Sequence, residues 1–186
     1  MKKIVLLILC ACVLVSLFAC GESGKSSGES VAGGKKLKDP ASVDMSAMLG
    51  AMVGTLNAGE GELYCSSSYS GDYEFDDDIL SGKFGDLLSG APECEHMLKY
   101  CAFFSDETYG PEYGAFLFDT PENAAEMKNY IETRFADLIK NSYLYPSVDT
   151  TLVENHTVFI DGNWVCYSAV KDNAAFRDAF YAFAEE

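Results

Sequence analysis

Two pairs of apolar segments, each interrupted by a short turn signal, constrain most strongly what this chain can fold into. The first pair spans residues 96–105 and 112–119, with Gly110-Pro111 between the two segments. The second pair spans residues 157–160 and 164–170 and surrounds Asp161-Gly162-Asn163. Gly-Pro marks a turn, and Asp-Gly supplies the positive φ that a tight hairpin requires. The pattern therefore predicts two hairpins and an antiparallel sheet of about four strands.

Helical patterns precede the first hairpin and follow each of the two hairpins. Apolar side chains recur three and four residues apart over residues 44–56, 121–142 and 173–184. Thr120 is suited to cap the second of these helices, and Pro121 is suited to its first position. The order is helix, then strand-strand-helix-strand-strand-helix. We therefore predict an α+β domain of two layers, with helices packed on the antiparallel sheet.

The stretch from residue 57 to residue 93 is rich in glycine, serine and acidic residues, and we expect it to be an irregular acidic loop. One short helix is predicted within it, at residues 78–88. Aromatic side chains are spread along the loop, and they are a candidate ligand-contact surface. The candidates are Tyr64, Tyr69, Tyr73 and Phe75. The favoured alternative is that these rings pack down onto the core.

The first twenty residues have the features of a bacterial lipoprotein leader. Lys2 and Lys3 precede an apolar run over residues 4–18, which is shorter than the roughly 20 residues of a membrane-spanning helix. The run ends in Leu17-Phe18-Ala19-Cys20, which resembles a lipobox. This resemblance implies removal of residues 1–19 and attachment of diacylglyceryl and N-acyl chains to Cys20. An uncleaved transmembrane anchor is the alternative.

Residues 20–40 contain mainly glycine, serine and lysine, and they cannot bury a core. We interpret them as a flexible tether between the lipidated Cys20 and a single domain over residues 41–186. The predicted location is the extracytoplasmic face of the cell membrane, and the membrane is the first predicted partner.

The charge of the chain excludes one class of partner. Thirteen basic and 29 acidic residues give a formal net charge of −16, which would become two charges more negative if Lys2 and Lys3 were removed. Because such a surface repels phosphate backbones, we exclude nucleic acid as a partner.

An even number of cysteines lies within the predicted domain, in a compartment that permits disulfides. These cysteines are Cys65, Cys94, Cys101 and Cys166. On one extended segment Cys94 and Cys101 would be about 23 Å apart, whereas a disulfide requires Cα atoms within about 7 Å. The favoured pairing is therefore Cys65–Cys94 with Cys101–Cys166, and free buried thiols are the alternative.

No catalytic or metal motif emerges from the sequence. The two histidines of the domain, His96 and His156, lack zinc-site spacing with the cysteines, and the acids of residues 72–78 lack the glycine and glutamate positions of an EF-hand. No nucleophile elbow, phosphate loop or dinucleotide fingerprint is present. We therefore name no catalytic residue, metal or cofactor.

From about Asp44 onward, the chain resembles a family of uncharacterised lipoproteins catalogued as domain-of-unknown-function family four-three-five-eight. The resemblance is carried by the segments at 44–48, 113–116, 123–126, 145–146 and 158–165. It implies a lipoprotein with one such domain after its signal peptide, and it brings no catalytic residues. The long 57–93 loop and the four cysteines depart from it.

The leader, the acidic surface and the aromatic loop favour a binding or interaction module at the cell surface. Its partner would be another envelope protein or a small ligand. An envelope hydrolase and a purely structural envelope protein are the two alternatives.

Overall fold

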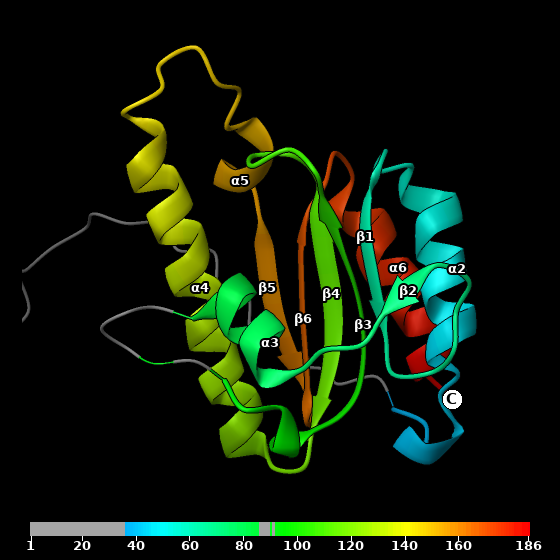
Figure 1. The fold of residues 1–186 in the computed structure, drawn as a ribbon. Coiled ribbons are helices and arrows are strands. Elements are labelled where there is room, and N and C mark those ends of the chain that lie inside the picture. Colours follow the sequence, from blue (N-terminus) through cyan, green and yellow to red (C-terminus); the bar gives the residue numbers. More distant parts are fainter. Residues whose placement is uncertain (1–35, 86–89, 91) are drawn as a thin grey trace, which may run out of the picture.

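The two predicted hairpins form four adjacent strands of the sheet and reach one of its edges (Figure 1). The computed structural model describes residues 36–85, 90 and 92–186. Within this part of the chain, five helices pack on an open, mostly antiparallel sheet of six strands ordered β2-β1-β3-β4-β6-β5. The strands are β1 (Gly61–Cys65), β2 (Asp72–Tyr73), β3 (Met97–Ser105), β4 (Glu112–Phe118), β5 (Thr157–Asp161) and β6 (Trp164–Ala169). The α+β class and both hairpins are confirmed.

Short polar side chains cap the starts of two of the helices, and Thr120 is the cap that was predicted from the sequence. Asp44 accepts a hydrogen bond from the Ala47 amide, and Thr120 accepts one from the Asn123 amide. The helices are α2 (Met45–Leu56), α3 (Asp77–Phe84), α4 (Pro121–Ser142), α5 (Thr151–Glu154) and α6 (Asn173–Ala184). Two 3₁₀ turns, η1 (Pro40–Ser42) and η2 (Cys94–His96), complete the description. The expected helix at 78–88 is α3, and residues 86–88 of that prediction lie outside the described residues.

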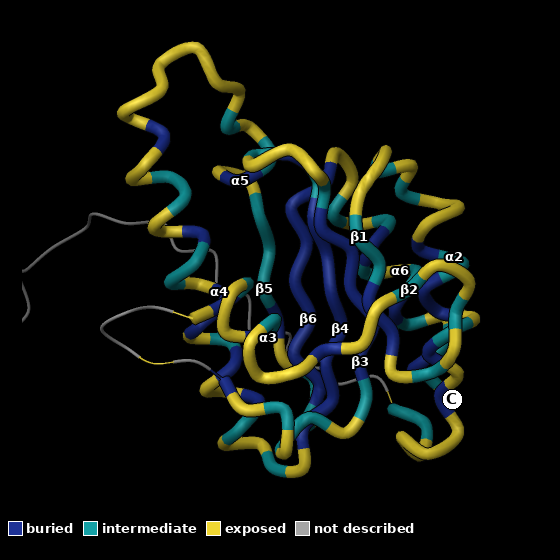
Figure 2. The backbone as a smooth tube through the Cα atoms, in the orientation of Figure 1, coloured by how far each residue is buried: buried dark blue, intermediate teal, exposed yellow. Residues whose placement is uncertain are grey.

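The prediction of two layers is wrong, because helices cover both faces of the sheet. Met45, Met48 and Phe180, from α2 and α6, pack on one face, and α3 with α4 packs on the other. Every residue of β4 is buried, and the central strands appear in Figure 2 as a buried band between the helices. A strand covered on both faces is a continuous apolar run, and Tyr113–Phe118 is such a run in the sequence.

The prediction that residues 57–93 form an irregular loop with one short helix is wrong in one part, because β1 extends the sheet beyond β3. Cys65 lies opposite Cys101 and Gly61 lies opposite Ser105. A Cβ atom at Gly61 would lie 2.2 Å from the carbonyl oxygen of Phe104, so glycine permits this close strand pairing. The composition of this segment, rich in glycine and serine, does not indicate a strand, because the strand pairs with a partner more than 30 residues away in the chain.

Candidate functional site

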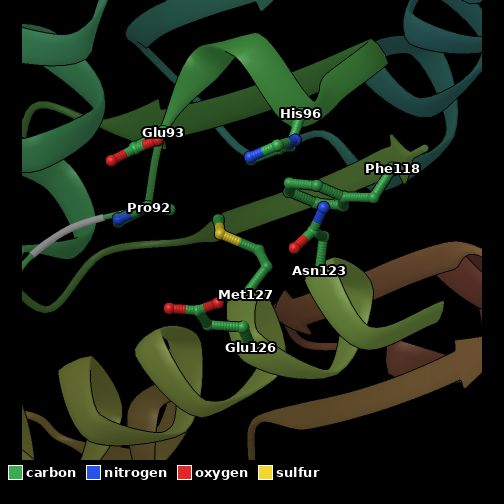
Figure 3. Close-up of a pocket in the computed structure, with 7 residues that line it drawn as sticks. All are labelled: Pro92, Glu93, His96, Phe118, Asn123, Glu126 and Met127. Atoms are coloured by element: carbon green, nitrogen blue, oxygen red, sulfur yellow. The ribbon is translucent and has the colours of Figure 1, made fainter. Parts of the chain in front are cut away.

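A small pocket lies where β3 begins, β4 ends and α4 begins (Figure 3). Its volume is about 170 Å³. The described lining residues are Pro92, Glu93, His96, Phe118, Asn123, Glu126 and Met127. None of these is a lysine, an arginine, a serine, a threonine or a cysteine. The pocket therefore combines one imidazole with carboxylates, and its described lining residues offer no hydroxyl, thiol or amine nucleophile.

The backbone and a chain of side-chain hydrogen bonds hold His96 in this pocket. The amide of Asp119 donates to the carbonyl oxygen of His96 over 3.0 Å. Asp119 Oδ2 lies 3.0 Å from His96 Nδ1, and Asp119 Oδ1 accepts from Asn123 Nδ2 over 2.7 Å. A carboxylate at Nδ1 favours the tautomer with its proton on Nδ1, which leaves the Nε2 lone pair free. In Figure 3 one ring nitrogen of His96 points toward the side of the cavity where Glu93 lies.

Proton affinities at this site follow from the same contacts. The hydrogen bond to Asp119 is the main cause that raises the pKa of His96 above its ordinary value of 6.5. The hydrogen bond from Asn123, followed by that from His96, lowers the pKa of Asp119 below 3.8. Protonated His96 and ionised Asp119 thus stabilise each other.

Carboxylates surround the exposed side of the imidazole. Glu95 Oε1 lies 3.5 Å from His96 Nε2, and one ligand atom from each of Glu93, Glu95 and His96 lies within 4.8 Å of the others. Glu126 closes the α4 side of the pocket and accepts a hydrogen bond from the Tyr130 hydroxyl. The pocket is therefore acidic and suited to a cation.

The structure does not bring the second histidine to this site. His156 stacks on Phe135 with ring centroids 4.1 Å apart, and its Nδ1 lies 2.7 Å from the carbonyl oxygen of Val153. The histidines and cysteines that we considered as zinc ligands are thus dispersed. The acids of residues 72–78 form local contacts: Asp76 caps α3, and Asp77 accepts from the Cys94 amide.

All four domain cysteines are free, and the favoured disulfide pairing is a prediction that needs correction. Cys65 packs in the core under α2 and α6, whereas Cys94 packs against the opposite core. Cys101 and Cys166 both lie opposite Ala115, on either side of β4. Two strand spacings separate them by about 9.5 Å, beyond the reach of a disulfide.

The predicted ligand-contact loop mostly faces inward. Tyr64 and Phe75 are buried and stacked, with ring centroids 4.3 Å apart, and Tyr69 packs against the core around α2. Only Tyr73, which is 57% exposed, presents its ring to solvent among the four. The alternative of rings packed on the core describes this loop better, because Tyr64 and Phe75 pack in the core on the α3 side of the sheet and Tyr69 packs against the core on the α2 side.

An exposed aromatic surface lies instead at the end of α4. Tyr143, Leu144 and Tyr145 are 81%, 74% and 58% exposed, and Val148 continues the patch. We call these four residues the tip. Beside it runs an open groove lined by Glu107, Thr108, Tyr109, Tyr145, Val148 and Asp149. Sequence reasoning missed this surface, although three large apolar residues past a helix end and before Pro146 are a visible signal.

The predicted lipid attachment at Cys20 and the leader of residues 1–19 lie outside the described residues. None of the helices in the described ranges is long and apolar enough to cross a membrane. Comparisons with protein-family models, with characterised proteins and with solved structures find no match to this chain. The resemblance to family four-three-five-eight, and the location that the leader implies, stay predictions.

Proposed function

We propose that this chain is a lipid-anchored extracytoplasmic binding module that captures a polypeptide partner through the tip. The observation that carries the proposal is the exposure of three consecutive large side chains, Tyr143, Leu144 and Tyr145. Scattered apolar residues are ordinary on a protein surface, but contiguous ones mark interaction sites. Tyrosine is also enriched in protein interfaces, since its ring packs while its hydroxyl remains hydrogen-bonded.

The position of the tip supports this proposal. Residues 36–38 pair with the end of α6, through hydrogen bonds that join Lys38 to Ala184 and Glu186 to Lys36. In Figure 1 this end of the domain lies opposite the loop that follows α4. A tether that leaves the domain at residue 36 would direct the tip away from the membrane, toward other envelope proteins.

Charge next to the tip indicates the chemistry of the partner. Glu107 and Asp149 line the groove, and the whole chain carries a net charge of −16. A polypeptide that offers apolar side chains to the tip and lysine or arginine to the groove would complement both features. The pocket at His96 is on another part of the domain, so this proposal does not depend on it.

Site-specific photo-crosslinking in intact cells tests the interaction. A photoreactive residue at position 144 should give one specific polypeptide adduct, identified by mass spectrometry, which Tyr143→Ser and Tyr145→Ser abolish. Leu98 provides a matched control position, because it is an exposed leucine on β3. Equal adducts at positions 98 and 144, or an adduct unaffected by the tyrosine substitutions, would refute the interaction.

The anchor is tested separately by metabolic labelling with a fatty-acid analogue. The wild-type chain should be labelled and should partition with membranes, while Cys20→Ala should be neither labelled nor membrane-bound. A Cys20→Ala protein that still partitions with membranes would overturn the anchor and leave the interaction test intact.

A further inference from the structure

We propose that Glu93, Glu95 and His96 form a binding site for a divalent transition-metal ion of the Zn²⁺ class. Histidine nitrogen and carboxylate oxygen are ordinary zinc ligands. In this chain they come from one 3₁₀ turn and the residue before it, since Glu93 is the cap of η2 and His96 is its last residue. The site does not depend on the tip or on the proposed partner.

Distances within the turn are close to those that coordination requires. Metal–ligand bonds of 2.0–2.1 Å in a tetrahedral site place ligand atoms about 3.3 Å apart. His96 Nε2 and Glu95 Oε1 are 3.5 Å apart, and all three ligand atoms lie within 4.8 Å of one another. Both glutamates are exposed, so side-chain rotation alone can draw the third ligand inward.

A separate feature outside the cluster orients its histidine. Asp119 holds His96 Nδ1 at 3.0 Å and is itself held by Asn123 at 2.7 Å. Metal-binding histidines commonly use their second nitrogen in this way, because a carboxylate there fixes the ring and increases the basicity of the ligating nitrogen. His96 is thus prepared to present Nε2 to an ion.

The charge around the turn has no nearby compensation among the described lining residues of the pocket. Glu93, Glu95, Asp119 and Glu126 surround one imidazole, and no lysine or arginine is among the pocket residues described. A divalent ion would reduce the repulsion among these carboxylates. The adjacent cavity of about 170 Å³ leaves room for a water molecule as fourth ligand.

Zinc titration of the full chain in detergent tests the site by isothermal calorimetry, after removal of metal with EDTA. Wild type should bind at least one equivalent of Zn²⁺ at that site. Its affinity for Zn²⁺ should be higher than that of His96→Gln. Loss of a ligand should weaken this binding by more than about 100-fold, since loss of an outer partner alone weakens metal sites by about 10- to 100-fold. Asp119→Asn should fall in that smaller range.

The matched control is His156→Gln, which removes the only other histidine. It should leave the zinc affinity unchanged. Long-range ¹H–¹⁵N spectra give a second measurement that does not depend on variants. Zn²⁺ should shift the Nε2 resonance of His96, and it should not shift the Nδ1 resonance in the same direction. Circular dichroism should show that all variants remain folded.

Three results would overturn the site. One is equal zinc affinity in wild type and His96→Gln. Another is a spectrum in which Zn²⁺ leaves His96 unperturbed. The third is Ca²⁺ that displaces Zn²⁺ at equal concentration, because this would indicate an acidic cluster that attracts any divalent cation.

Discussion

Two charged pairs lie near β4 and α4, and they differ in their exposure to solvent. The inner pair is Arg134–Glu112 and the outer pair is His96–Asp119. Arg134 donates two hydrogen bonds to Glu112, over 3.2 and 2.8 Å, and a third to the Lys83 carbonyl oxygen over 2.8 Å. The side chain of Glu112 is only 7% exposed, whereas that of His96 beside Asp119 is 41% exposed. The inner pair has its hydrogen bonds satisfied within the protein, while the outer pair leaves a nitrogen available to carboxylates and solvent.

The difference separates a structural role from a binding role. Both carboxylate oxygens of Glu112 already accept hydrogen bonds from Arg134, and removal of one partner of a buried pair leaves an uncompensated charge in the interior. An exposed pair contributes little to stability, because water screens it, but it remains accessible to a ligand. Predictions that compare the two regions follow, from the largest expected effect to the smallest.

Removal of the inner arginine should have the largest effect on stability. Arg134→Ala should lower the free energy of unfolding by about 3–5 kcal/mol, because Glu112 is left buried without its partner. Urea denaturation, followed by the fluorescence of the single tryptophan Trp164, measures it. Glu132→Gln provides the control, because it breaks the exposed Lys128–Glu132 pair on the same helix and should change stability by less than about 0.5 kcal/mol. Similar losses in both variants would contradict the comparison.

Cysteine reactivity distinguishes the interior from the surface by another measurement. Desolvation and the hydrogen bond to Asp77 raise the pKa of Cys94 from 9.0 to about 12. The thiolate is the reactive form, so about 1,000-fold less of it is present at neutral pH than for an ordinary cysteine. In the native protein, maleimide should label Cys94 slowly and leave Cys65, Cys101 and Cys166 unlabelled until urea unfolds the domain.

Peptide mass spectrometry resolves the labelling of each cysteine. Asp77→Asn should accelerate the labelling of Cys94, because it removes the charge that helps to raise its pKa. Rapid native labelling of Cys101 or Cys166, both fully buried, would show that the sheet is not closed on both faces.

The outer pair should respond to pH. In metal-free protein, Asp119→Asn should lower the pKa of His96 toward its ordinary value of 6.5, measured by an NMR titration of the imidazole. Because the folded pKa of His96 is raised, its stabilisation is complete below pH 6.5 and is lost as the pH rises through the folded pKa. Asp119 has a lowered pKa, so its contribution is present above pH 3.8 and is lost in acid.

Wild-type stability should therefore decline more than that of Asp119→Asn as the pH rises above 6.5, when the two are compared by denaturation. Parallel pH profiles for the two proteins would show that the hydrogen bond between His96 and Asp119 does not persist in solution.

The tip should contribute least to stability. Tyr143→Ser and Leu144→Ser should each change the free energy of unfolding by less than about 0.5 kcal/mol, since both side chains are exposed. Phe135→Ala, on the buried face of the same helix, should lose about 3–5 kcal/mol. A large loss in the tip variants would show that these side chains pack in the folded protein, and it would remove the basis of the proposed interaction surface.

Local patterns predicted the elements whose signals are close together in the chain. Asp161-Gly162 predicted the β5–β6 turn because Gly162 adopts a φ of +57°, and Thr120 predicted the start of α4 because its side chain bonds three residues ahead. The strand β1 was not predicted, because it is a five-residue segment stabilised by pairing with β3. The pocket was not predicted either, because it combines residues 92–96 with Phe118 and the first turns of α4.

By itself, the sequence determined the α+β class, the two hairpins, the caps of the helices and the strong negative charge. These depend on turn preferences, side-chain periodicity and composition, which act within a few residues. Only the tertiary structure decided that helices cover both faces, that Cys65 and Cys94 lie on opposite sides of the sheet, and that Asp119 orients His96. Each of these depends on which distant segments pair, and pairing is decided by the burial of the whole sheet.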